Sequence, residues 1–250
     1  MRQFNSFEKS EKSEKNMTRK LLLISNSIMH GREYLDHCAD EIVEFLGSVK
    51  SILFIPYALF DFNEYETIAK KRFQKLDIVL NSIHHAQNPA KEVTDAQAIF
   101  IGGGNTFRLL NHLYKNDLIK SIKKRVGEGM LYIGASAGSN VACPTIKTTN
   151  DMPIVQPPSL HALDLIPFQI NPHYVDPDPR SKHKGETRTQ RIKEFHEEND
   201  SSVIGLREGS WLRVENKTVQ LKGSTGAKIF QKGKKPVEYT SKNYLDLTNP

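Results

Sequence analysis

A serine lies among small residues at a point where the chain changes character. Ser136 belongs to Gly134-Ala135-Ser136-Ala137-Gly138, after the apolar run 130–133 and before a segment that can begin a helix. A tight turn between strand and helix lifts a serine hydroxyl clear of the backbone, and the helix N-terminus directs N–H groups toward developing negative charge. The pattern favours a nucleophilic serine, but such a turn also packs a helix against a strand without doing chemistry.

A second turn is rich in glycine and ends another apolar run. It reads Ile101-Gly102-Gly103-Gly104-Asn105-Thr106-Phe107. Open α/β folds place their sites at the carboxyl ends of parallel strands, so we expect both turns at one sheet edge. The N–H of Ala137 and that of Gly103 or Gly104 then form an oxyanion hole. Binding of a nucleotide phosphate is the weaker alternative, because the run lacks the lysine of a P-loop and the G-x-G-x-x-G spacing.

A nucleophilic serine also requires a base that removes its proton, and the chain has nine histidines. His173 follows the apolar residues 168–170, and prolines at positions 172, 177 and 179 stiffen the loop on which we expect it. A stiff loop can hold an imidazole still. From the residues alone, His161 and His183 remain alternative bases, whereas the other histidines are read as surface or packing residues.

Apolar runs alternate with helix-periodic segments over the first 140 residues, and together they must position these side chains. The predicted strands are Lys20–Ser25, Ser51–Tyr57, Asp77–Ile83, Ala96–Ile101 and Met130–Gly134, and the predicted helices are Glu33–Phe45, Glu64–Phe73 and Phe107–Gly127. The alternation predicts the α/β class, with a mainly parallel, doubly wound sheet and helices on both faces. Farther along we predict a helix at Glu186–Glu198 and short strands at Val203–Leu206, Trp211–Val214 and Val219–Leu221.

Composition narrows the class of protein. With 250 residues, 38% hydrophobic and 26% charged, the chain is typical of a globular protein, and no apolar run approaches the roughly 20 residues that span a bilayer. We predict a flexible N-terminal extension at 1–17 and a single domain at 18–250. The net charge of +6 comes from scattered lysines, which favours neither a nucleic acid nor a membrane partner. Two cysteines without metal-ligand spacing suit a reducing cytoplasm. Oligomeric state stays open.

Several longer motifs resemble the aspartyl dipeptidase family, also named peptidase E. They are GGGNTF at 102–107, GASAGSNVACPTIKTTNDMPI at 134–154, QINPHY at 169–174, DPDPRSKHKGETR at 176–188 and GLREGS at 205–210. The resemblance runs from about residue 18 to at least residue 222. It implies a fold related to class I glutaminase-like domains and removal of an N-terminal aspartate from dipeptides. It makes Ser136 the nucleophile and His173 the base, and it implies no metal or organic cofactor.

The resemblance leaves two residues open as the acid that orients His173, namely Glu208 and Asp151. Glu208 follows a predicted strand and is slightly favoured, whereas Asp151 lies on a loop and can instead bind the substrate's ammonium, as can Glu186. An aspartate side chain calls for arginine, which binds a carboxylate through two hydrogen bonds. The expected substrate-binding residues are Asn105, Arg180, Arg188 and Arg191.

Two other functions stay open at this stage. One is an isoaspartyl or cyanophycinase-like peptidase of the same fold. The other is a non-catalytic module that keeps the serine turn and binds a small ligand. These functions can be distinguished by testing which dipeptides the protein hydrolyses: those with an aspartyl, a β-aspartyl or a neutral N-terminal residue.

Overall fold

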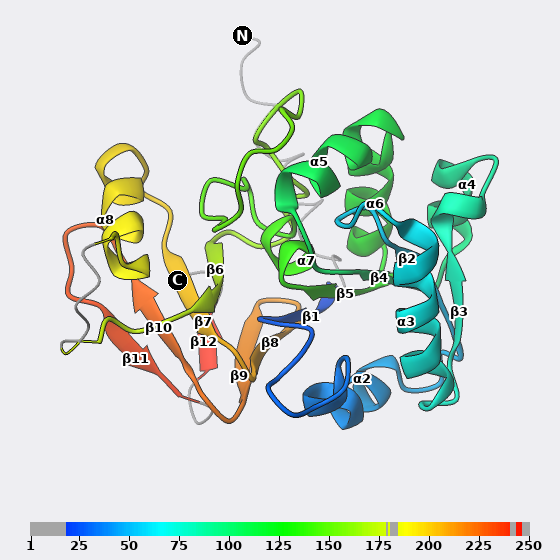
Figure 1. Cartoon of the computed structure of the whole chain (residues 1–250), viewed down its shortest axis with the longest axis horizontal. Coiled ribbons are helices and arrows are strands. Elements are labelled where there is room, and N and C mark those ends of the chain that lie inside the picture. The colour runs from blue at the N-terminus through cyan, green and yellow to red at the C-terminus, as the bar shows by residue number, and fades with distance from the viewer. Residues whose placement is uncertain (1–18, 179, 181–184, 241–243, 247–250) are drawn as a thin grey trace, which may run out of the picture.

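The centre of the fold is a parallel sheet. The computed structural model describes residues 19–178, 180, 185–240 and 244–246, so the predicted extension at 1–17 and His183 lie outside it (Figure 1). The parallel strands lie side by side in the order β1 (Lys20–Ile24), β5 (Leu131–Ala135), β4 (Ala98–Ile101), β2 (Ser51–Ile55) and β3 (Val79–Ser82). They overlap the five predicted strands almost completely.

Antiparallel strands extend this sheet beyond β1. They are β8 (Ser210–Glu215), β9 (Thr218–Gly223) and β12 (Tyr244–Asp246). Within the described residues a second, smaller sheet has the order β11 (Val237–Tyr239), β10 (Ala227–Phe230), β7 (Val203–Arg207) and β6 (Gln169–Tyr174). The turn between β7 and β8 therefore carries the chain from the smaller sheet to the larger one.

Helices cover both faces of the larger sheet, because alternate residues of its strands point in opposite directions. Leu22 and Ile24 pack in a core with α2 (Ala39–Leu46) and α3 (Phe62–Gln74). Leu21 and Leu23 pack in the opposite core, with α4 (Pro89–Asp95), α5 (Thr106–Lys115), α6 (Leu118–Gly127) and α7 (Ala137–Asn140). A further helix, α8 (Arg188–Glu198), packs on the smaller sheet.

Two predictions of secondary structure were wrong. The single helix predicted over Phe107–Gly127 is two helices, because Asp117 adopts a left-handed backbone with φ of 54° and breaks the helix between α5 and α6. The loop predicted around His173 is strand β6, which pairs in parallel with β7 and contains a bulge between Asn171 and Tyr174. Neither α4 nor the strands after residue 223 were predicted.

Both cysteines are free thiols in the interior. Cys38 and Cys143 belong to the opposite cores of the larger sheet, and burial raises the pKa of each thiol to about 12. The thiolate, which is the reactive form, is therefore scarce at neutral pH. No helix in the described part of the chain is long and apolar enough to cross a membrane.

Candidate active site

Ser136 occupies the sharp turn between β5 and α7. Its backbone lies at φ 52° and ψ −108°, a region that non-glycine residues avoid at a cost of about 1–3 kcal/mol. The surrounding hydrogen bonds impose this geometry, because the Ser136 N–H donates to Ile24 O at 2.9 Å and its carbonyl accepts from Ser139 N and Asn140 N. The strained turn exposes the side chain at the carboxyl edge of the sheet.

Close packing explains the glycines on either side of Ser136. A Cβ added to Gly138 would lie 2.1 Å from Ile101 O, at the end of the neighbouring strand β4, and one added to Gly134 would lie 2.5 Å from Gly138 O. These acceptors are backbone atoms that cannot move aside, so a larger residue at either position would push α7 away from the sheet. The small residues thus serve packing as well as the turn.

The structure brings Ser136, His173 and Glu208 together from three separate segments. Ser136 Oγ lies 2.9 Å from His173 Nε2, and His173 Nδ1 lies 2.6 Å from Glu208 Oε1. His173 sits in the bulge of β6 at φ 52°, and Glu208 lies in the turn between β7 and β8. The side chain of His173 is 38% exposed and that of Glu208 is 51% exposed, so both face solvent at the edge of the two sheets.

Two polar residues that sequence reasoning missed hold these segments in place. Ser25, fully buried just after β1, accepts a hydrogen bond from His173 N at 3.0 Å and donates one to Leu206 O at 2.8 Å. The neighbouring Asn26 accepts from Gly209 N at 2.8 Å, next to Glu208. They fix the unusual backbone of His173 and the turn that carries Glu208. The missed signal is a pair of polar residues directly after a continuous apolar strand, at the sheet edge where the site was expected.

Asp151 lies elsewhere in the same region. Its Oδ2 accepts hydrogen bonds from Thr106 N at 2.7 Å and from Thr106 Oγ1 at 2.6 Å, so the carboxylate caps the start of α5. A carboxylate in this position is also favoured by the helix dipole. Asn105 caps the same helix through Arg108 N and donates to Met152 O at 2.9 Å. Asn105, predicted to bind substrate, thus uses both side-chain groups within the protein.

The three candidate arginines differ in their surroundings. The side chain of Arg180 is 92% exposed and pairs with Asp178, and Arg191 pairs with Glu186 at 3.2 Å. The side chain of Arg188, half-buried at the start of α8, makes no ion pair or hydrogen bond within the described part of the chain. Burial lowers the pKa of its guanidinium, the charge of Arg191 lowers it further, and the charge of Asp151 raises it. Arg188 therefore lies within electrostatic reach of Asp151.

The second glycine turn lies against Ser136, as the shared sheet edge requires. A Cβ on Gly103 would lie 3.1 Å from Ser136 Cβ. The backbone N–H of Gly103 bonds to the Tyr65 hydroxyl, whose pKa it lowers against the larger effect of burial. Gly104 has φ of 133°, which suits only glycine. In the described residues, no hydrogen bond occupies the N–H of Gly104 or that of Ala137.

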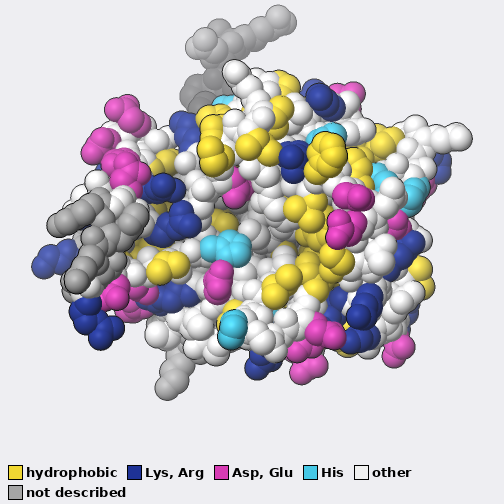
Figure 2. Space-filling model, viewed as in Figure 1, with side chains coloured by type: hydrophobic (Ala, Val, Ile, Leu, Met, Phe, Trp, Pro, Cys, Tyr) yellow, Lys and Arg dark blue, Asp and Glu magenta, His cyan; other side chains and the backbone are white. Residues whose placement is uncertain are grey.

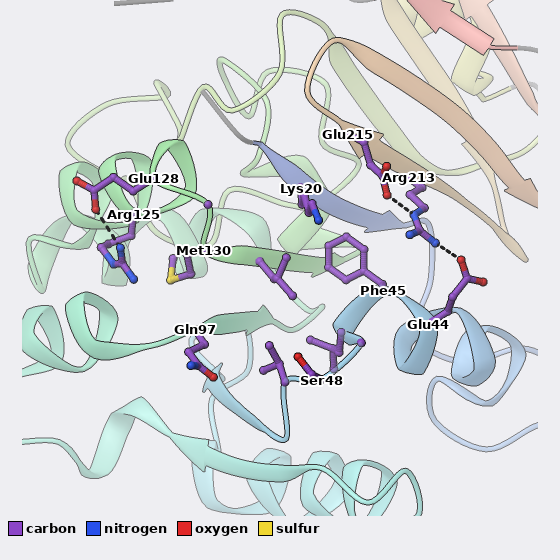
Figure 3. A pocket seen from close by; sticks show the side chains of 15 residues that line it. Lys20, Glu44, Phe45, Ser48, Gln97, Arg125, Glu128, Met130, Arg213 and Glu215 are labelled. Carbon is purple, nitrogen blue, oxygen red and sulfur yellow. Dashed lines mark hydrogen bonds and ion pairs between the residues drawn. The ribbon is translucent and has the colours of Figure 1, made fainter. Parts of the chain in front are cut away.

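On the face seen in Figure 2, the surface is hollowed between the smaller sheet with α8 and the part that carries α5 and α7, and histidine and carboxylate side chains lie near its centre. A separate pocket of about 560 Å³ lies at the opposite, amino-terminal edge of the larger sheet (Figure 3). The two arginines that line it are already paired, Arg125 with Glu128 and Arg213 with Glu44 and Glu215. It contains no residue predicted to act on substrate, whereas the carboxyl edge carries Ser136, His173 and Glu208.

Known proteins of similar sequence share most of the chain. The model of peptidase family S51 matches residues 21–222. A peptidase E from Streptomyces coelicolor is 50% identical over 218 residues, which are 87% of this chain and 90% of that protein. A protein from Drosophila melanogaster named "Probable alpha-aspartyl dipeptidase" is 44% identical over 216 residues, or 85% of this chain and 90% of the relative.

Solved structures of peptidases share the fold of this chain. The crystal structure of a peptidase from an Actinobacterium matches with a TM-score of 0.70 and 20% identity, over 92% of this chain and 98% of that chain. At this level of identity the similarity concerns the arrangement of the backbone alone. It confirms the predicted α/β class.

Proposed function

The chain belongs to peptidase family S51, and from this premise we propose that it is a serine dipeptidase that hydrolyses dipeptides with an N-terminal aspartate. The observation that carries the proposal is the continuous row of contacts at 2.9 Å from Ser136 to His173 and at 2.6 Å from His173 to Glu208. This is the arrangement that turns a serine hydroxyl into a nucleophile. We assign Ser136 as the nucleophile, His173 as the base and Glu208 as the acid that orients it.

The reaction proceeds through an acyl-enzyme. His173 Nε2 takes the proton of Ser136 as Oγ attacks the carbonyl carbon of the aspartyl residue, and Glu208 stabilises the imidazolium from Nδ1. The same imidazole then protonates the leaving amine. A water molecule deprotonated by His173 attacks the ester and releases aspartate. Each step uses only side chains of the row described above.

The oxyanion of the tetrahedral intermediate requires N–H donors whose hydrogen bonds are not used elsewhere. We propose Ala137, which begins α7 directly after Ser136, and Gly104 for this role. The alternative donor Gly103 is less suited because its N–H bonds to the Tyr65 hydroxyl. The positive φ of Gly104 turns its peptide away from the regular strand direction, which supports a role specific to this loop.

Selectivity for an N-terminal aspartate requires a cation for its side-chain carboxylate and an anion for its α-ammonium. We propose that Arg188 binds the substrate's side-chain carboxylate, since Arg180 and Arg191 are exposed and paired with acidic neighbours. Asp151 has one oxygen engaged with Thr106, and its other oxygen accepts the free α-ammonium. An N-terminal aspartate satisfies both groups. A peptide without a free N-terminus leaves the second oxygen of Asp151 without a partner, which disfavours hydrolysis of internal peptide bonds.

Replacing Arg188 by alanine should lower kcat/KM for Asp-Leu by about 100-fold, because a two-point hydrogen bond to a charged carboxylate contributes about 3 kcal/mol. Arg191→Ala is the matched control, since it removes the same side chain three residues farther along α8. We expect it to change kcat/KM by less than about threefold, as a solvent-exposed ion pair contributes little. Steady-state kinetics of both variants measure this, and a large loss in Arg191→Ala alone would reverse the assignment.

Comparison of three dipeptides tests the proposed function itself. Wild-type protein should hydrolyse Asp-Leu and leave β-Asp-Leu and Ala-Leu nearly untouched, because only the first presents carboxylate, ammonium and scissile carbonyl in the assigned positions. Release of free leucine measures the rate. Preference for β-Asp-Leu would support the isoaspartyl alternative, and no turnover of any of the three would contradict an enzymatic function.

A further inference from the structure

Two histidines and a glutamate form a compact cluster away from the triad. The residues are Glu66, on α3, and His84 and His85, on the short helix η3 (Ile83–His85) that follows β3. One oxygen or nitrogen atom from each lies within 4.8 Å of the other two. Figure 1 shows α3 and β3 side by side at the edge of the sheet, so segments distant in sequence supply the three groups.

The three side chains lie close enough together to become ligands of one metal ion. Glu66 Oε2 lies 2.7 Å from His85 Nε2 and 3.8 Å from His84 Nε2. Zinc bonds imidazole nitrogen and carboxylate oxygen at about 2.0–2.1 Å, so tetrahedral ligand atoms stand about 3.3 Å apart. The observed separations bracket this value. The rings of His84 and His85 face each other, with centroids 3.9 Å apart and planes 39° apart, so their side chains must rotate to bring the three atoms onto one ion.

His84 has a hydrogen-bond partner on its Nδ1 side, as metal-bound histidines usually have on the ring nitrogen that does not bind the metal. Its Nδ1 lies 2.6 Å from Ser82 Oγ. In the tautomer in which Nδ1–H donates to that hydroxyl, the lone pair of Nε2 is available to a metal, which then replaces the hydrogen bond between Nε2 and Asn63 Oδ1. Asn63 Oδ1, 3.1 Å from His84 Nε2, adds an oxygen at the open side.

Glu66 is buried and turns one of its two carboxylate oxygens toward the histidines. Its side chain is 9% exposed, and Lys70 pairs with Oε1 at 2.7 Å, so the oxygen that faces the histidines is Oε2. A carboxylate held in this way presents one defined oxygen to a metal. Imidazole nitrogens with a single carboxylate suit zinc and its neighbours in the first transition row, whereas magnesium and calcium require mostly oxygen ligands.

We propose that Glu66, His84 and His85 form a binding site for Zn²⁺ that links α3 to η3. The site is separate from the triad, which comes from the ends of β5 and β7 and from β6, and it holds whether or not the proposed peptidase activity is correct. Ile83, which lies between Ser82 and His84 in the sequence, is fully buried in the core. It therefore anchors η3 whether or not a metal is bound. The ion binds the folded protein and stabilises it by mass action.

Calorimetric titration of the full chain with Zn²⁺ at pH 7.5 tests this proposal. We expect His85→Asn and Glu66→Gln each to weaken binding at least tenfold, since each removes one ligand. His85 is 58% exposed, so its variant should fold even if replacement of the buried Glu66 disturbs α3. The matched control is His161→Asn, because His161 is exposed and only its backbone N–H and carbonyl take part in hydrogen bonds.

Two further readouts distinguish a built site from scattered surface binding. Co²⁺ should give the intense ligand-field absorption of a low-coordinate site in wild type and in His161→Asn, and lose it in His85→Asn. Zn²⁺ should raise the Tm of the same two proteins and not that of His85→Asn. Absence of saturable binding, or Zn²⁺ affinity in His85→Asn and Glu66→Gln within threefold of wild type, overturns the proposal.

Discussion

Ser136→Ala should lower kcat for Asp-Leu by about 10⁵–10⁶-fold, because loss of the nucleophile removes the acyl-enzyme route altogether. Alanine keeps the Cβ of serine, so the backbone at φ 52° and the packing of α7 are left unchanged. Release of leucine at saturating substrate gives kcat. Ser121→Ala, on α6, is a matched control for the loss of a serine hydroxyl and should keep wild-type turnover.

The double variant Ser136→Ala with His173→Ala gives a sharper result. If the two residues act as one unit, the second substitution should change the residual rate by only a few-fold, even though His173→Ala alone lowers kcat about as much as Ser136→Ala. Multiplicative losses would show that His173 works independently of Ser136, contrary to the contact at 2.9 Å. Circular dichroism and Tm of each variant establish that the fold is retained.

The sequence predicted the parallel half of the sheet because the relevant signals are local. Strands such as β1 and β4 are covered on both faces and are therefore apolar at nearly every position. The glycines beside Ser136 also stand within a short window, and Gly134 is required by Gly138 O four residues later, although Gly138 itself is required by Ile101 O on the neighbouring strand β4. Both features can be recognised from a few consecutive residues of the sequence.

The smaller sheet depends on pairing between distant segments, and the sequence predicted it poorly. Residues 169–174 contain a proline and a histidine and read as a stiff loop, yet they form β6 because β7, more than thirty residues later, offers a parallel partner. The left-handed backbone of His173 follows from that bulge and from the buried hydroxyl of Ser25. No local pattern around His173 contains this information.

The metal-ligand cluster was missed for a similar reason. His84 and His85 end a strand, and with no partner in view they read as surface or packing residues. Glu66 approaches them only because α3 packs against β3, which is a tertiary contact. Glutamate on an amphipathic helix usually faces water, so its burial was the informative observation, and it is visible only in the folded protein.

Glu208→Gln should lower kcat for Asp-Leu by about 10³–10⁴-fold with little change in KM. The amide is neutral and does not stabilise the imidazolium, and its NH₂ group can donate to His173 Nδ1 and hold the wrong tautomer. Asp151→Asn should instead raise KM about tenfold or more and leave kcat within a few-fold. The amide oxygen of asparagine can still accept from Thr106, while the charge that binds the substrate's ammonium is lost.

These two variants separate the candidate acids because each substitution is isosteric and the kinetic parameters respond differently. Glu208 is 2.6 Å from the imidazole, whereas both hydrogen bonds made by the Asp151 carboxylate go to Thr106 at the start of α5. An acid that acts through His173 affects the transition state, and one that binds the ammonium affects substrate and transition state alike. A collapse of kcat in Asp151→Asn, with Glu208→Gln active, would require the site to rearrange on binding substrate and would return the catalytic role to Asp151.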